Sequence, residues 1–181
     1  MLQESLGEQI LPDNVTIEDD PTLERGLGSY SVDSAGLKAE KMTFIENGVV
    51  KSYVLGLHSA RKLGMKPIGR ENGLSNTRVL PGSQSRDELI ADIKKGILVK
   101  GFNGGTVNLQ NGTFSRPAYG DLIENGKVTD KPVSGFIVAC GDLKDAFKGV
   151  SIANDTPAQP SSKYRFAAPT TRLSGMTVSG K

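Results

Sequence analysis

The residues that most often carry chemistry are scarce in this sequence of 181 residues, which contains one histidine, His58, and one cysteine, Cys140. A zinc ion usually takes three or four His, Cys, Asp or Glu ligands. His58 is followed by Ser-Ala-Arg-Lys, and not by the acidic residue and second histidine of a helical zinc motif. The sequence therefore predicts no metal site built by this chain alone, and no cofactor.

Nucleophilic catalysis is the second chemistry to weigh. Cys140 stands in FIVACGDLKD, at the expected end of a strand and just before a helix N-terminus, a position that favours a reactive thiolate. Triad members meet in space and not in sequence, so an autonomous hydrolase using Cys140, or a serine, with His58 is an alternative function. No serine occupies a G-x-S-x-G elbow, however, and most cysteines in such apolar surroundings are packing residues.

A glycine-rich segment, Gly101-Phe102-Asn103-Gly104-Gly105, follows an expected strand. Its backbone amides are suited to an anion. The segment lacks the Gly-Lys-Ser/Thr ending of a phosphate loop, however, and the residues after it, TVNLQNG, are typical of a strand and not of a helix. A glycine-rich bend or a close backbone approach is the favoured interpretation.

Asn154 and Asp155, in VSIANDTPAQP, stand where a strand ends and a proline-rich loop begins. An Asx turn that closes the strand is the structural interpretation. A place in the lining of a cleft is the functional one.

The elements that must position these residues are mostly short strands joined by hairpins. The tetrapeptide Ile-Glu-Asn-Gly occurs at 45–48 and again at 123–126, each time between strand-like segments. An Asn-Gly pair supplies the positive φ angles of a two-residue type I′ turn, and Asn111-Gly112 repeats the device. Because two-residue loops cannot join parallel strands, we expect a mainly antiparallel sheet. The expected strands are 41–45, 49–55, 96–102, 106–109, 113–116, 118–123, 127–139, 163–168 and 171–180.

Helices are few and short. The clearest begins at the capping-box pair Ser85 and Glu88 and is expected to end at Gly96. Asp142 is the expected cap of a second helix, LKDAFK, and residues 59–64 form barely a third. The predicted fold class is α+β, a mainly antiparallel, barrel-like β-sheet with about three short helices.

The charges give no reason to expect a nucleic-acid or membrane partner. The 22 basic and 20 acidic residues leave a net charge of +2 and are mixed along the chain. No apolar run approaches the roughly 18 residues of a membrane span, and the N-terminus lacks the basic and apolar regions of a signal peptide. With a single cysteine, these features predict a cytoplasmic protein.

The order of the segments is more informative than any one of them. In chain order they are SLGEQILP, YSVDSAGL, FIENGVVKSYVL, HSARKLGM, RDELIADIKKGILVKGF, GGTVNLQNGTFSR, YGDLIENGKV, GDLKDAF, ANDT and GMTVSGK. This series resembles the C-terminal half of the TldD/PmbA family, also known as modulators of DNA gyrase. The likeness runs from about residue 5 to the end, and the family's N-terminal half has no counterpart. The chain thus resembles a single C-terminal domain over residues 1–181, expressed alone or left by truncation.

The resemblance implies a peptide-processing metallopeptidase assembly of two related subunits. The TldD-type subunit holds zinc, through an HExxxH helix of its N-terminal half and a late cysteine of its C-terminal half. The PmbA-type subunit, also called TldE, lacks these ligands and completes the enclosure around the peptide. Here the segment after Asn154-Asp155, where catalytic subunits place their cysteine, contains none, and Cys140 comes too early. The resemblance therefore implies the non-catalytic PmbA/TldE type, with zinc only in a TldD-type partner and no catalytic or metal residue carried over.

An exposed sheet edge with glycine-rich strands can bind an extended peptide by strand addition. The residues predicted to contact the substrate are Phe102, Asn103, Gly104 and Gly105, with Asn154 and Asp155 nearby. The expected partner is a TldD-type subunit or a second copy of this chain, so we also expect self-association. A structural remnant that only dimerises is a further alternative.

Overall fold

The computed structural model of the chain describes residues 4–108, 110–157 and 166–180. Contacts divide it into two compact units. The strand unit comprises Gly82–Asp155 and the segment from Thr170 onward, and the loop unit comprises the segment up to Pro81 with Thr156–Pro169. The single domain expected over residues 1–181 stays a prediction.

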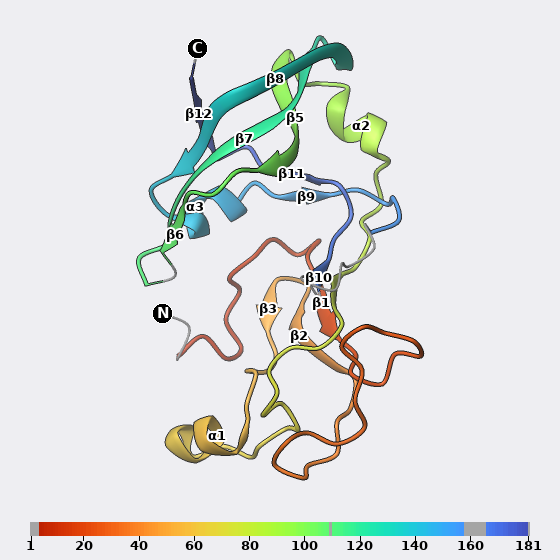
Figure 1. The fold of residues 1–181 in the computed structure, drawn as a ribbon, viewed down its shortest axis with the longest axis vertical. Helices are drawn as coiled ribbons and strands as arrows, with labels where there is room; N and C mark the ends of the chain where they lie inside the picture. Colours follow the sequence, from red (N-terminus) through yellow and green to blue (C-terminus); the bar gives the residue numbers. More distant parts are fainter. Residues whose placement is uncertain (1–3, 109, 158–165, 181) are drawn as a thin grey trace. The chain divides into compact units, whose positions relative to one another are not determined.

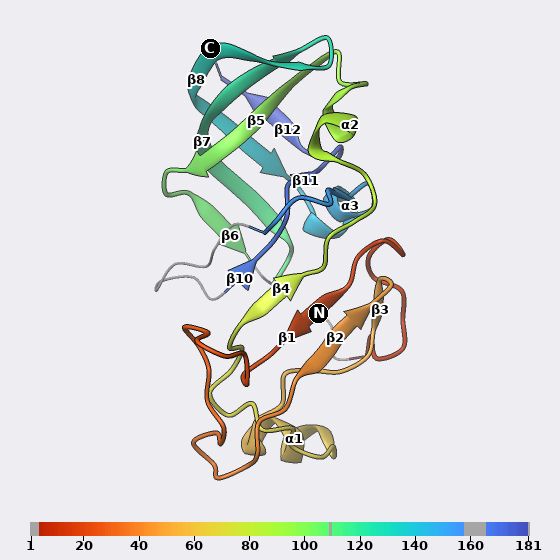
Figure 2. The ribbon, with the colours of Figure 1, turned by 90° about the vertical axis from the view of Figure 1, so that its right-hand side faces the viewer.

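In its described residues, the loop unit contains one helix (Figure 1) and one small sheet with strand order β10-β4-β1-β2-β3 (Figure 2). Its elements are β1 (Ile17–Asp19), β2 (Met42–Glu46), β3 (Val49–Val50), α1 (Leu57–Leu63), β4 (Thr77–Val79) and β10 (Phe166–Ala167). The pairings are antiparallel except that of β10 with β4, in which Phe166 lies opposite Thr77. Hairpin signals cannot indicate such a parallel pair, because its strands are distant in the sequence.

A buried ion pair ties the loop unit together. Arg70 and Asp19 have fully buried side chains, and Arg70 Nε lies 3.1 Å from Asp19 Oδ2. The carboxylate also accepts hydrogen bonds of 2.8 Å from the Ser75 amide, the Ser75 hydroxyl and the Thr77 hydroxyl. Arg70 in turn donates to the Glu40 carbonyl at 2.6 Å. These bonds fix irregular segments that have little regular structure of their own.

The strand unit holds the larger sheet, ordered β12-β8-β7-β5, with β6 also paired to β7 (Figure 2). A separate pair joins β11 to β9. The elements are α2 (Arg86–Ile90), β5 (Lys95–Phe102), β6 (Thr106–Asn108), β7 (Thr113–Glu124), β8 (Lys127–Cys140), α3 (Leu143–Phe147), β9 (Ser151–Ile152), β11 (Thr171–Arg172) and β12 (Thr177–Ser179). The α+β class is confirmed. The strand order is an open path, so the described residues form no closed barrel.

Two of the three predicted Asn-Gly turns have the expected backbone. Asn47 and Gly48 have φ angles of 49° and 77°, and Asn125 and Gly126 have φ angles of 48° and 76°. Each pair joins two antiparallel strands, β2 to β3 and β7 to β8. Positive φ at both central positions is what a type I′ turn requires.

The third turn differs from its prediction. Strand β6 ends at Asn108 and β7 begins at Thr113, so four residues join them. Asn111 does not have a positive φ, and the Gly112 amide donates to the Asn108 carbonyl at 2.9 Å. The side chain of Asn108 accepts a hydrogen bond from the amide two residues on, at 2.9 Å. This Asx turn begins the loop before the Asn-Gly pair is reached.

Helix α2 has the predicted start and a different end. Ser85 Oγ accepts from the Glu88 amide, and the Glu88 carboxylate accepts from the Ser85 amide, which completes the capping box. The hydrogen bonds from the Ser85 amide and hydroxyl lower the pKa of Glu88. The predicted end at Gly96 is wrong, because Lys95 and Gly96 pair with β7 as the first residues of β5. Cross-strand pairing outcompetes the last turn of the helix.

The other two helices lie close to their predicted positions. Helix α3 follows Asp142, whose side chain accepts from the Lys144 amide at 2.8 Å. Helix α1 begins at Leu57, two residues before the predicted start, and Gly64 ends it in the left-handed conformation, with φ of 65°. No helix in the described part of the chain is long and apolar enough to cross a membrane.

One face of the larger sheet is apolar and carries the core of the strand unit. Ala118, Phe136 and Val138 are buried there. The register places Phe136 opposite Ala118, and Val138 opposite Arg116, on the paired strands β8 and β7. Directly opposed residues share a face of a sheet, so Arg116 shares the apolar face with this core.

Candidate functional site

The chain from Lys95 to Asn108 forms a single edge of the larger sheet, interrupted once. Strand β5 pairs with the second half of β7, and β6 pairs with its first three residues, both antiparallel. Among the described residues, β5 has no strand neighbour on its other side. The interruption consists of Asn103, Gly104 and Gly105, so the predicted contact residues 102–105 lie where the edge strand breaks.

The break has a cause in the facing strand. The Asn103 amide donates to the Pro117 carbonyl at 2.8 Å. In an antiparallel ladder the carbonyl and the amide nitrogen of one residue face the same neighbour. The nitrogen of Pro117 therefore also faces the edge strand, and proline has no hydrogen to donate. A regular edge strand would place a backbone carbonyl opposite the Pro117 nitrogen, where it would have no N–H partner. The break in the edge strand avoids this unpaired carbonyl.

Glycine is required at the break. Gly104 and Gly105 have φ angles of 65° and 88°, in the left-handed region. A Cβ atom at Gly105 would stand 2.6 Å from the Ser115 carbonyl oxygen, whereas one at Gly104 would meet nothing within 4 Å. The close backbone approach expected from the sequence is therefore found at Gly105.

Aromatic and cationic side chains cover the break on the apolar face. The Phe102 ring packs edge-on against Phe114, with centroids 5.6 Å apart and planes at 80°. The Arg116 guanidinium lies over the Phe102 ring, 5.0 Å from its centroid. Arg116 Nε donates to the Gly104 carbonyl at 2.6 Å. Phe102 was predicted from the sequence. Phe114 and Arg116 were not, because they reach Phe102 only through strand pairing.

Asn154 and Asp155 have other neighbours. The Asn154 amide donates to the Gln84 carbonyl at 2.7 Å. The Asp155 carboxylate accepts from the Thr170 amide at 2.8 Å and from the Thr170 hydroxyl at 2.5 Å. The carboxylate thus binds a segment fifteen residues further along the chain, in place of the local Asx turn predicted from the sequence. These contacts give the two residues a structural role, and they differ from the contacts that hold residues 102–105.

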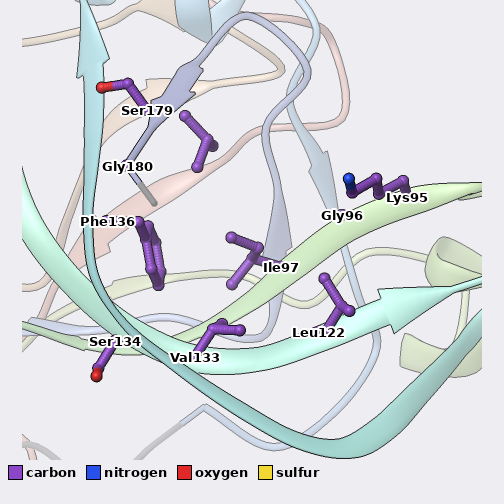
Figure 3. Close-up of a pocket in the computed structure, with 10 residues that line it drawn as sticks. Lys95, Gly96, Ile97, Leu122, Val133, Ser134, Phe136, Ser179 and Gly180 are labelled. Carbon is purple, nitrogen blue, oxygen red and sulfur yellow. The ribbon is translucent and has the colours of Figure 1, made fainter.

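A hollow of about 370 Å³ lies on the apolar face of the larger sheet. Strands β12, β8, β7 and β5 all contribute residues to it. The apolar side chains that line it are Ile97, Leu122, Val133, Phe136 and Val178. Figure 3 shows the side chains of Ile97, Val133 and Phe136 gathered around it. Since both edge strands line one hollow, the sheet is strongly curved. The core face carries Ile97 and Val99 of β5 with Phe136 and Val138 of β8. Leu98 and Ile137, which stand between them, are apolar as well, so neither the face nor its curvature is visible in the sequence pattern.

The described residues of this chain do not fit a zinc site. His58 is exposed on α1 in the loop unit, and Cys140 is half-buried at the end of β8 in the strand unit. Within the described ranges, no group of three or more His, Cys, Asp or Glu side chains is placed to hold a metal ion. Neither unit by itself contains a cysteine–histidine pair.

The chain is similar in sequence to a family of metallopeptidases. Residues 1–180 match the family model described as PmbA/TldA metallopeptidase C-terminal domain. The chain is 38% identical over 155 residues to the metalloprotease PmbA of Escherichia coli O157:H7, covering 85% of this chain and 34% of that protein. It therefore spans about a third of the length of this curated relative.

Solved structures of proteins from this family have a similar fold. A putative modulator of DNA gyrase from Bacteroides thetaiotaomicron has a TM-score of 0.84 and 35% identity, and the match covers 99% of this chain and 40% of that one. TldE from Thermococcus kodakarensis has a TM-score of 0.82 and 25% identity, over 99% and 42% of the two chains. The chain belongs to the PmbA/TldD metallopeptidase family, of which it represents the C-terminal domain.

Proposed function

We propose that this chain is the C-terminal domain of a non-catalytic, PmbA/TldE-type subunit of a peptide-processing metallopeptidase assembly. It binds extended peptides along the edge formed by β5 and β6. A TldD-type partner holds the zinc and performs the cleavage. The assembly acts in the cytoplasm, in keeping with the composition of the chain.

The observation that carries this proposal is the free edge from Lys95 to Asn108. Strands β5 and β6 are hydrogen-bonded to β7 on one side and, within the described residues, to no strand on the other. Such an edge offers a row of backbone donors and acceptors to an added strand. Backbone pairing depends little on the identity of the side chains, so it is suited to a domain that binds many different peptides.

The non-catalytic assignment rests on the inventory of ligands. The chain has one histidine and one cysteine, and they belong to different units. A hydrolytic zinc site keeps three protein ligands and an open position. One histidine and one cysteine are too few for such a site, so we propose that the related partner supplies the zinc ligands.

Hydrogen exchange with a peptide ligand tests the proposal. A peptide of alternating apolar residues, added in excess, should slow amide exchange within 95–108, and its backbone N-methylated analogue should not. Protection confined to the opposite edge, 177–180, or no protection at all, would contradict the proposed binding edge. The dimerisation-only alternative predicts instead that protection of 95–108 rises with the concentration of this chain alone.

A further inference from the structure

Arg116 is a half-buried arginine whose orientation is fixed from two sides. Its Nε donates to the Gly104 carbonyl at 2.6 Å, and its Cζ atom lies over the Phe102 ring, 5.0 Å from the ring centroid. The Phe102 ring is itself held edge-on by Phe114. An arginine side chain ordinarily loses rotamer entropy when a ligand immobilises it. Here the fold has already ordered it.

The charge of Arg116 is not neutralised within the described residues. Three other arginines contrast with it, because Arg70 pairs with Asp19, Arg78 with Glu18 and Arg172 with Asp92. No carboxylate of the described residues lies within 4.0 Å of the Arg116 guanidinium, since no ion pair includes it. A fixed and unneutralised guanidinium is a ready receptor for an anion.

The geometry of the guanidinium narrows the class of anion. The bond to Gly104 uses Nε, so the two terminal nitrogens keep their N–H donors for a ligand. Such a fork binds a carboxylate or a phosphate through two parallel hydrogen bonds, and of these two groups only the carboxylate occurs in an unmodified peptide. Phe102 is 40% exposed beside it and offers an apolar contact to the rest of the same ligand.

The position of Arg116 connects this receptor to the binding edge. The side chain contacts the break at residues 103–105, where β5 and β6 cannot offer regular pairing. A peptide strand laid along the edge loses backbone bonds at this point. A side-chain or terminal contact there supplies an interaction that backbone pairing does not.

We infer that Arg116, held by Gly104 and Phe102, binds a carboxylate of the peptide at the break in the edge strand. The carboxylate belongs to an acidic side chain or to the peptide C-terminus. This inference deepens the proposed function and rests on it, because it gives the domain a chemical preference that strand addition alone lacks.

Binding measurements with matched peptides test it. The probes are one capped peptide of alternating apolar residues with a central glutamate, its glutamine analogue, and the glutamine analogue with a free C-terminal carboxylate. Wild type should bind at least one carboxylate peptide about tenfold more tightly than the capped glutamine peptide, as expected for one bidentate charged contact. Comparison of the two carboxylate peptides identifies the source of the group.

Variants separate a specific receptor from general charge attraction. Arg116→Lys keeps the charge but removes the fork and the Nε bond, so it should abolish the preference while the capped glutamine peptide binds as before. Arg86→Lys is the matched control, an exposed arginine of the same unit that has no acidic partner among the described residues, and it should leave the preference intact. Far-ultraviolet circular dichroism checks that each variant is folded.

The outcomes are distinct. Equal binding of all three peptides by wild type, or a preference that survives in Arg116→Lys, overturns the inference and leaves strand addition standing. Absence of binding by every peptide overturns the proposed function together with the inference. Phe102→Leu should weaken the carboxylate preference, because it removes the ring on which the guanidinium lies.

Discussion

Replacing Arg70 by methionine should destabilise the loop unit by about 3–5 kcal/mol, because it leaves Asp19 as a buried charge without a countercharge. Both side chains are fully buried, and their charged atoms are 3.1 Å apart. Asp19 would keep three neutral donors, from Ser75 and Thr77, which do not replace the lost charge. The loss is a large part of the 5–15 kcal/mol that typically stabilises a domain.

Arg78→Met is the matched control for this change. Arg78 also pairs with a carboxylate across strands β4 and β1, at 3.1 Å from Glu18, but its side chain is 42% exposed. An ion pair in that setting contributes about 0–1 kcal/mol. The same substitution should therefore cost several times less at position 78 than at position 70.

Urea unfolding followed by circular dichroism measures both costs, since the chain has no tryptophan for fluorescence. Hydrogen exchange at residues 17–19 and 75–77 assigns the loss to the loop unit. The double variant Asp19→Asn with Arg70→Met should cost less than the sum of its single changes, by about 1–3 kcal/mol. Equal costs for Arg70→Met and Arg78→Met, or an additive double variant, would refute the reasoning.

Three further substitutions test other contacts. Gly105→Ala should destabilise the strand unit by about 2 kcal/mol or more, since its φ is 88° and the new Cβ would meet the β7 backbone; a Tm equal to that of wild type would contradict this. Asp155→Ala should cost about 2 kcal/mol in urea, because the Thr170 amide and hydroxyl lose their acceptor, and faster exchange of the Thr170 amide should accompany it. The Glu71 amide is the main cause that holds the pKa of Asp33 below its ordinary value, against the opposing effect of burial. A lowered pKa in the folded state means that the ionised form stabilises the fold, fully above the unfolded value of about 3.9 and progressively less as the pH falls through the folded value. The Asp33→Asn variant should accordingly lose less stability than wild type below about pH 4, and parallel acid limbs for the two proteins would exclude this role.

Features set by neighbouring residues were predictable from the sequence. The turns at Asn47-Gly48 and Asn125-Gly126 need only two residues with positive φ, and the capping box needs only Ser85 and Glu88. Each signal lies within one short segment, so its physics does not depend on the rest of the fold. The glycine-rich bend at 103–105 was also predicted from its own residues, but its cause, Pro117 in the facing strand, lies outside that segment.

Features set by pairing between distant segments were not predictable. Arg70 donates to the Asp19 carbonyl across 51 residues, and no spacing rule connects them. Arg116 reaches the break because β7 places it beside Gly104. Pro117 was expected to separate two strands, whereas it lies inside β7, opposite the break. The end of α2 was missed for a related reason, since the pairing of Lys95 with Glu124 is non-local.

The central claim is that this chain binds peptide without carrying the catalytic metal. Size-exclusion chromatography with light scattering, run on this chain alone and after mixing with a TldD-type subunit, tests it when zinc is measured in each peak. We predict co-elution of the two chains, with zinc in proportion to the partner alone. Stoichiometric zinc on this chain by itself, or a monomer that does not associate with the partner, would contradict the account.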